Sequence, residues 1–171
     1  MANIFDYITW RGDLTLAQVP HNEIDLLILC RMSYLPLDDI VPASFSSTIT
    51  VGQAMEGFLA LPNPESRVYL PADVQLAQVL KDCHRFRSLP LCGYVNCLAK
   101  DRQEQFSATT VLLNPGKSFV VYRGTDNSLV GWKEDFNMGF MTPVPSQIDA
   151  VSYLEQAAQE LEGTLIVGGH S

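Results

Sequence analysis

PVPSQIDAVSYLEQAAQELEGTLIVGG, residues 143–169, predicts a helix followed directly by a strand. Apolar residues recur along one face of the helical part: Ile148, Val151, Leu154, Ala158 and Leu161. Ser146 and Asp149 have the spacing of a capping box at its start, and Gly163 is a typical C-terminal stop. The apolar run Leu165–Val167 suits a strand buried on both faces of a sheet.

Two β-rich runs upstream predict a hairpin. QFSATTVLL (105–113) and SFVVYRG (118–124) flank NPGK (114–117). Pro115 and Gly116 suit the two middle positions of a type II turn. The second run, the helix and the final strand form a βαβ unit, so we expect parallel pairing with a right-handed crossover.

A buried helix is predicted in HNEIDLLILCRMSYL, residues 21–35. Asn22 can cap it, with Asp25 supporting the cap three residues later. Apolar residues crowd several faces of this helix, and Pro36 is expected to end it.

The segment 36–71 is rich in Pro, Ser and Asp, which predicts loops with one short helix around Val51–Ala60. PADVQLAQVLKDCHRF (71–86) predicts another helix, capped by Asp73. The order is helices, hairpin, loop, helix and strand. This order indicates a single α/β domain over residues 1–171 with a central sheet.

Composition and charge bound the class of partner. The chain is 47% hydrophobic and 18% charged, as is ordinary for a globular protein, and its net charge is −8. That charge argues against nucleic acid or an anionic membrane surface as the main partner. The first residues do not resemble a signal peptide, and no segment approaches the ~18 apolar residues of a membrane span. We therefore expect a cytoplasmic protein without a transmembrane segment.

The cysteines do not have the spacing of metal ligands. Cys92 and Cys97 form the closest pair, so a site with His84 is the alternative to buried, reduced thiols. Disulfides are disfavoured in the expected compartment. We expect no metal and no organic cofactor.

Two short motifs could carry chemistry. GHS (169–171) follows the final strand and matches the first half of a nucleophile elbow, G-x-S-x-G, whose sharp turn exposes the serine hydroxyl. RGT (123–125) ends the second hairpin strand, where a loop can supply a donor to a developing oxyanion. Each also has a plain alternative as a simple turn at the end of a strand.

Taken together in chain order, VVYRGT (120–125), W-x-x-D (132–135) and IVGGHS (166–171) resemble lipase-like α/β-hydrolases of the fungal, class three lipase type. Those enzymes have an F/Y-R-G-S/T strand end, a W-x-x-D and a G-H-S-x-G elbow in that order. The chain is similar in particular to an uncharacterised bacterial family of that superfamily, over nearly its whole length. The resemblance implies the N-terminal portion of an α/β-hydrolase fold, ending at the nucleophile elbow.

The resemblance also implies a role for each motif residue. Ser171 is expected to be the nucleophile and Thr125 an oxyanion-hole residue. His170 fills the x position of the elbow and is not the triad base, and Gly169 precedes it as the small residue that the turn requires.

The residues around Thr125 are expected to support it. Gly124 permits a tight turn, and Arg123 and Asp135 are expected to form an ion pair that anchors the following loop. The alternative for that pair is two solvated surface charges. Trp132 belongs either to a loop that covers the site or to the core.

A serine triad also needs a histidine base and an acid, which follow the nucleophile in α/β-hydrolases. His21, His84, Asp126 and Asp135 all come too early in the chain. We therefore expect the native protein to continue beyond residue 171. A terminal carboxylate at Ser171 would place negative charge beside the oxyanion, and the final strand would lack covering elements.

The first functional hypothesis is a serine hydrolase of the lipase/esterase type, inactive as the isolated segment. It would cleave a small-molecule or lipid carboxylic ester through an acyl-enzyme. The second is a catalytically silent binding or scaffold module with the same fold. The third is acyl transfer to another acceptor, as in a thioesterase or acyltransferase. The sequence specifies no oligomeric state.

Overall fold

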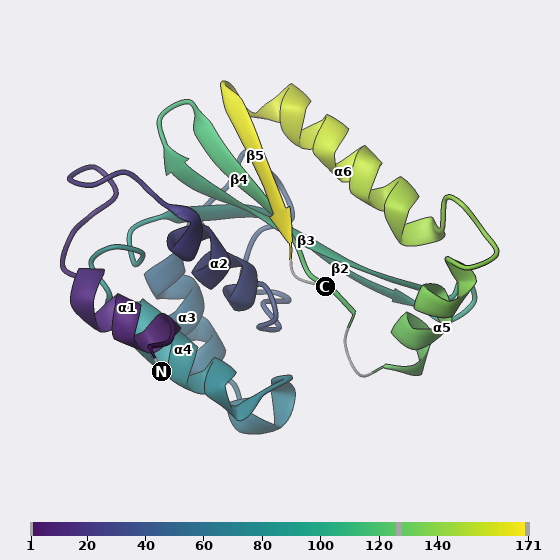
Figure 1. Ribbon diagram of the computed structural model, residues 1–171, viewed down its shortest axis with the longest axis horizontal. Helices are drawn as coiled ribbons and strands as arrows, with labels where there is room; N and C mark the ends of the chain where they lie inside the picture. The colour runs from purple at the N-terminus through teal and green to yellow at the C-terminus, as the bar shows by residue number, and fades with distance from the viewer. Residues whose placement is uncertain (1, 126–127, 170–171) are drawn as a thin grey trace.

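The computed structural model describes residues 2–125 and 128–169. Within these residues, a mixed five-stranded sheet lies between two groups of helices (Figure 1). The helices are α1 (Ile4–Arg11), α2 (Glu23–Met32), α3 (Val51–Leu59), the 3-10 helix η1 (Pro64–Arg67), α4 (Pro71–Asp82), α5 (Leu129–Asn137) and α6 (Pro145–Glu160). The strands are β1 (Ile49–Thr50), β2 (Pro90–Ala99), β3 (Glu104–Asn114), β4 (Lys117–Tyr122) and β5 (Thr164–Gly169).

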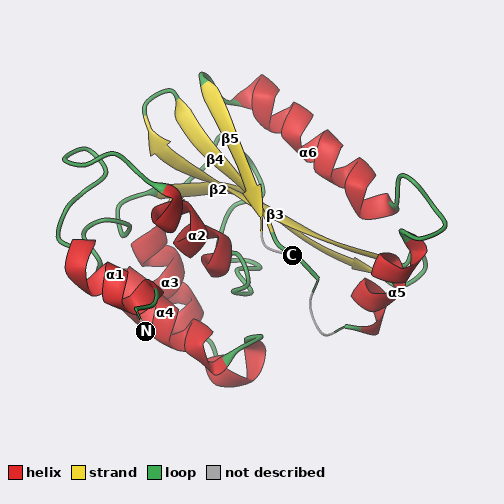
Figure 2. Ribbon diagram, in the orientation of Figure 1, coloured by secondary structure: helices red, strands yellow, loops and turns green. Residues whose placement is uncertain are grey.

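The strand order β1-β2-β3-β4-β5 follows the chain. Figure 2 shows β4 and β5 side by side, with α6 on one side of the sheet and α1–α4 on the other. Strands β1 to β4 pair antiparallel, and β5 pairs parallel with β4. Gly116, in the β3–β4 turn, has a φ of 76°, the left-handed value that a type II turn requires at that position. The hairpin, the parallel βαβ pairing and the mixed α/β class are confirmed.

Two apolar cores cover the two faces of the sheet. Phe119 and Val121 of β4 belong to the core beneath α1–α4. Val120 faces the other way and packs in a second core with Tyr153 and Ala157 of α6. Because β4 is buried on both faces, the segment that leaves its carboxyl end starts from a fixed position.

The predicted helices of the N-terminal half are confirmed, but two of them end earlier than expected: α2, and α4, which ends at Asp82 instead of Phe86. Asn22 Oδ1 accepts from the N–H groups of Ile24 and Asp25 at 2.9 and 3.1 Å, so the capping box of α2 is present. The prediction that Pro36 ends α2 is wrong. The helix ends at Met32, because Ser33 takes the C-cap position and its hydroxyl bonds the Cys30 carbonyl at 2.7 Å.

In α4, Asp73 lies in the first turn and is not the N-cap itself. Its carboxylate accepts from the backbone N–H of Leu70, the N-cap residue, at 2.9 Å. The cysteines are all free, and three of them, Cys30, Cys83 and Cys92, are buried.

The capping box predicted at Ser146 and Asp149 is wrong. The helix α6 begins two residues earlier than predicted, with Val144 as N-cap, and Gln147 Oε1 accepts from the Val144 N–H at 3.1 Å. Pro145 takes the first helical position, where its missing N–H costs nothing.

The predicted apolar face of α6 is wrong in part. Ile148 and Val151 are exposed, whereas Tyr153 and Ala157 are buried against the sheet. The Tyr153 hydroxyl reaches Thr110 on β3 at 2.9 Å, which sets the rotation of the helix.

Two further expectations were wrong. Strand β5 is not buried on both faces, because it is the edge strand of the described sheet and Val167 is 49% exposed. The loop expected after RGT contains α5. Strand β2 had not been predicted, since Gly93 at φ 63° marks a register shift that interrupts its alternation.

No helix in residues 2–125 and 128–169 is both long and apolar enough to cross a membrane.

Candidate active site

The carboxyl ends of β4 and β5 lie side by side at one end of the sheet. The parallel register pairs Tyr122, the last residue of β4, with Gly169, the last residue of β5. RGT (123–125) therefore begins at the end of the sheet where β5 ends at Gly169 (Figure 1). Ligands of open α/β sheets bind outside the carboxyl ends of parallel strands. The structure thus brings RGT and Gly169, the first residue of GHS, to one end of the sheet.

The two glycines before His170 and Ser171 allow β5 to pack closely. A Cβ on Gly168 would lie 2.7 Å from the Phe119 ring, and one on Gly169 would lie 2.9 Å from the Tyr122 carbonyl oxygen. Neither distance is tolerable for a side chain, so both positions need glycine. His170 and Ser171 themselves lie outside the described residues.

Thr125 is oriented by Asp135. The Thr125 hydroxyl donates to Asp135 Oδ1 at 2.9 Å. Asp135 is on α5, whose N-cap Ser128 accepts from the Gly131 N–H at 3.1 Å. With this hydroxyl committed, the Thr125 backbone N–H, which has no partner among the described residues, is the group that could face an oxyanion.

Gly131 allows α5 to lie directly against Thr125. A Cβ at this position would be 2.8 Å from Thr125 Cγ2 and 2.1 Å from Gln105 Oε1. A side chain at this position would therefore displace Gln105 or Thr125, or move α5 and Asp135 away from Thr125.

The predicted ion pair between Arg123 and Asp135 is wrong. Arg123 Nη2 instead donates to Asn96 Oδ1 on β2 at 2.9 Å, and Asp135 accepts from Thr125. The reason is that a helix follows the strand instead of a loop. This helix sets Asp135 above Thr125, while the Arg123 side chain runs along the sheet to Asn96.

Glu134 anchors α5 and had not been predicted from the sequence. Its side chain is buried, and its two carboxylate oxygens accept from the backbone N–H groups of Gln105 and Ser146, each at 2.8 Å. Glu134 thus joins α5 to the start of β3 and to the first turn of α6. A carboxylate is favourable at the N-terminus of a helix, so Glu134 could have been considered as a partner for the start of α6. The spacing between Glu134 and that helix in the sequence gave no indication of this contact.

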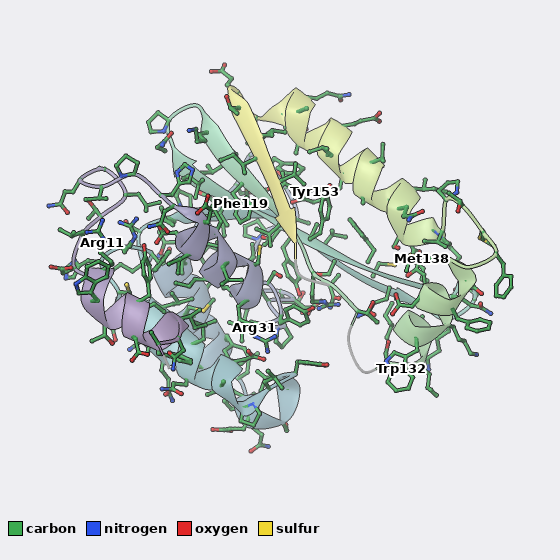
Figure 3. All side chains as sticks on the ribbon, in the orientation of Figure 1. Arg11, Arg31, Phe119, Trp132, Met138 and Tyr153 are labelled. Atoms are coloured by element: carbon green, nitrogen blue, oxygen red, sulfur yellow. The ribbon has the colours of Figure 1, made fainter. Side chains whose placement is uncertain are left out.

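Trp132 lies on the outer face of α5 and is 60% exposed, so its placement in the core is wrong (Figure 3). Other large apolar side chains of this region are also exposed: Leu129, Phe136, Met138, Phe140 and Met141. Phe136 and Phe140 contact one another, with ring centroids 5.3 Å apart. Coverage of the site by Trp132 remains a prediction.

Two cavities adjoin the segment after β4, and Arg123 lines both. A cavity of about 310 Å³ lies toward α5 and α6 and is lined by Thr125, Asp135 and Glu134 among others. A second, of about 420 Å³, is lined by Tyr34, Tyr69 and Asn96 among others. The candidate site therefore has space on both sides of RGT.

A cluster of ionisable groups lies next to the anchor of α5. Glu104 is fully buried at the start of β3, and Arg102 contacts it at 2.5 Å and Asp149 at 3.3 Å. Burial raises the pKa of Glu104 to about 7, and the hydrogen bond and charge of Asp149 act in the same direction while Arg102 opposes them. A perturbed carboxyl group of this kind is common near functional sites.

The two described histidines lie at the opposite end of β4. His84 precedes Arg85, and His21 follows Pro20, whose carbonyl accepts from Arg85 Nη2 at 3.2 Å. Arg85 lines a cavity that also includes Pro115 and Gly116 of the β3–β4 turn. Neither histidine is therefore placed to act at Thr125.

Comparison with known families gives one match. A protein-family model described as Mbeg1-like matches residues 80–171, slightly more than half of the 171 residues. The matched region begins within α4 and contains β2 to β5, α5 and α6. No curated protein and no solved structure matches the chain.

Proposed function

The chain belongs to the Mbeg1-like family, and on that basis we propose that it carries the nucleophile of a serine hydrolase of the lipase/esterase type. Ser171 attacks the carbonyl carbon of a carboxylic ester and the alcohol leaves, which forms an acyl-enzyme that water then hydrolyses. The parallel pairing of Tyr122 with Gly169 carries this proposal, because Arg123 directly follows one of these two residues and the proposed elbow begins at the other.

The geometry supports a specific division of labour at Thr125. Asp135 holds the hydroxyl at 2.9 Å, so the backbone N–H is the proposed donor to the oxyanion. Gly131 and Glu134 are positioning residues, since they fix α5 against Thr125. The mechanism also requires a histidine base, and neither His21 nor His84 is proposed for it.

The proposal is tested with a fluorophosphonate probe on the native protein. An activated serine forms an O–P bond with the probe and releases fluoride, whereas an ordinary surface serine does not react. We expect labelling at Ser171, its loss in Ser171→Ala, and normal labelling in Ser152→Ala, a control at an exposed serine of α6. A folded protein that takes no label, or that keeps its label in Ser171→Ala, would contradict the proposal. The first of these results would favour the silent binding module.

A further inference from the structure

A pocket with two arginines lies beside the segment that carries Thr125. We call it the arginine pocket: the cavity of about 420 Å³ whose lining includes Tyr34, Arg67, Tyr69, Asn96, Arg123 and Ser128. It is bounded by η1, β2 and the residues that follow β4. Its position two residues from the proposed oxyanion donor makes it part of the surroundings of the reacting ester.

The two guanidinium groups in this pocket have no carboxylate partner among the described residues. Arg123 bonds only the Asn96 amide oxygen through its side chain, and its Nε is buried without a hydrogen-bond partner in the described part of the chain. Arg67 donates from Nε to the Pro62 carbonyl at 3.0 Å. A buried donor without an acceptor is unfavourable, so the pocket favours an added acceptor.

Three of the other five arginines are paired with acids: Arg31 with Asp73, Arg85 with Asp25, and Arg102 with Glu104. Arg11 and Arg87 have no carboxylate partner among the described residues, but neither lines the arginine pocket.

Among the described residues, hydrogen bonds connect Arg123 to the acidic residue Asp38 through Asn96. Asp38 accepts from Asn96 Nδ2 at 3.0 and 3.1 Å and from the Tyr94 hydroxyl at 3.2 Å. Its carboxylate therefore orients Asn96, which in turn holds Arg123. Asp38 is not among the residues that line the arginine pocket.

One wall of the arginine pocket is aromatic. The Tyr34 and Tyr69 rings are 5.7 Å apart between centroids, and the Arg31 guanidinium lies 4.8 and 5.8 Å from the two ring centroids. Two 2.7 Å hydrogen bonds to Asp73 fix Arg31. Burial raises the pKa of Tyr34, and the charges of Arg31 and Arg123 and a hydrogen bond from the Gly124 backbone partly offset this. That hydrogen bond links the wall to RGT.

From these contacts we infer that the arginine pocket binds a negatively charged group of the substrate, a carboxylate or a phosphate, so that the preferred substrate is an anionic ester. Only the statement that the bound anion belongs to a substrate rests on the proposed hydrolase function. The anion site itself rests on the cavity and on two guanidinium groups that have no carboxylate partner in the described part of the chain. Arg67 and Arg123 bind the charge, and the tyrosine wall packs against the apolar part of the ligand.

The first experiment measures binding without catalysis. The native protein is titrated calorimetrically with phenyl phosphate, with benzoate and with neutral benzyl alcohol, at constant ionic strength. We expect saturable binding of one or both anions and none of the alcohol, and Arg67→Gln should weaken it about tenfold, as expected for a lost charge-assisted hydrogen bond. The stronger of the two anions identifies the phosphate or the carboxylate as the preferred group. Arg87→Gln, at an exposed arginine outside the pocket, should bind as wild type.

The second experiment measures selectivity. The native protein hydrolyses p-nitrophenyl butyrate, which is neutral, and mono-p-nitrophenyl succinate, which is similar in size and carries a carboxylate. We expect the ratio of kcat/KM for the anionic over the neutral ester to fall about tenfold in Arg67→Gln and to stay unchanged in Arg87→Gln.

The outcomes separate the two proposals. Anion binding that Arg67→Gln weakens, without hydrolysis of either ester, would support the anion site and overturn the hydrolase. Hydrolysis without anion binding and without a change of ratio in Arg67→Gln would overturn the anion site alone. Arg123→Lys, which keeps the charge but not the planar fork, tests the second arginine without removing its cation.

Discussion

The Thr125 hydroxyl donates a 2.9 Å hydrogen bond to Asp135 of α5, and this contact takes the place of the expected ion pair between Arg123 and Asp135. It ties the segment after β4 to a residue of α5 that lies ten positions further along the chain. The position of the proposed oxyanion donor therefore depends on how α5 is held.

Asp135→Ala should lower kcat for p-nitrophenyl butyrate about tenfold with little change in KM, because misplaced oxyanion donors weaken transition-state binding. Asp135→Asn keeps an oxygen acceptor for Thr125 and should retain most of the activity. Asp101→Ala, at an exposed position, is the control. Unchanged kcat in a folded Asp135→Ala protein would show that this hydrogen bond does not position the donor.

Glu134→Ala should destabilise the protein by about 2–3 kcal/mol, because it removes a buried acceptor from the N–H groups of Gln105 and Ser146. The measurement is urea unfolding followed by circular dichroism. Glu160→Ala, at an exposed position of α6, should change the free energy of unfolding by less than about 0.5 kcal/mol. Equal stability of the two variants would exclude the anchoring of α5 by Glu134.

Glu104 should make stability fall as pH rises. Its folded pKa, about 7, lies above the usual value of 4.5, so between these values the unfolded chain has released a proton that the folded protein still binds. The stability that Glu104 contributes is therefore fully present below about pH 4.5 and is lost by about pH 7. The free energy of unfolding is measured from pH 4.5 to 8, and Glu104→Gln should reduce its change over this range by about 1–3 kcal/mol. Glu162→Gln, at an exposed position, should leave the change as in the wild type. A pH profile unaltered in Glu104→Gln would refute the assignment.

The ion pair between Arg85 and Asp25 is fully buried, and Arg85 also donates to the carbonyls of Leu14, Val19 and Pro20. Asp25→Ala should cost about 3–5 kcal/mol in free energy of unfolding, since it leaves an uncompensated buried charge. Asp82→Ala breaks the exposed pair with Lys81 and should cost less than about 1 kcal/mol.

The double variant Asp25→Leu with Arg85→Met should lose less stability than the sum of the single variants, because no charge is left buried. Additive losses would mean that the two side chains act independently.

Local signals predicted much of the fold. The Asn22–Asp25 capping box, the Pro115–Gly116 turn and the βαβ unit each depend on residues close in sequence or on a regular period, and all three are present. The helix α5 was missed because its apolar side chains, Leu129, Trp132 and Phe136, lie on its exposed face instead of a buried one.

The order of residues by itself determined the helices α2, α3, α4 and α6, the β3–β4 hairpin and the parallel pairing of β4 with β5. Only the tertiary structure decided which partners the residues of RGT have: Asp135 for Thr125, Asn96 for Arg123, and Glu134 as the anchor of α5. The physical reason is the distance along the chain over which each interaction acts. Caps and turns are settled by neighbours along the chain, whereas a side-chain partner two strands or one helix away is set by the packing of the whole sheet and its two cores.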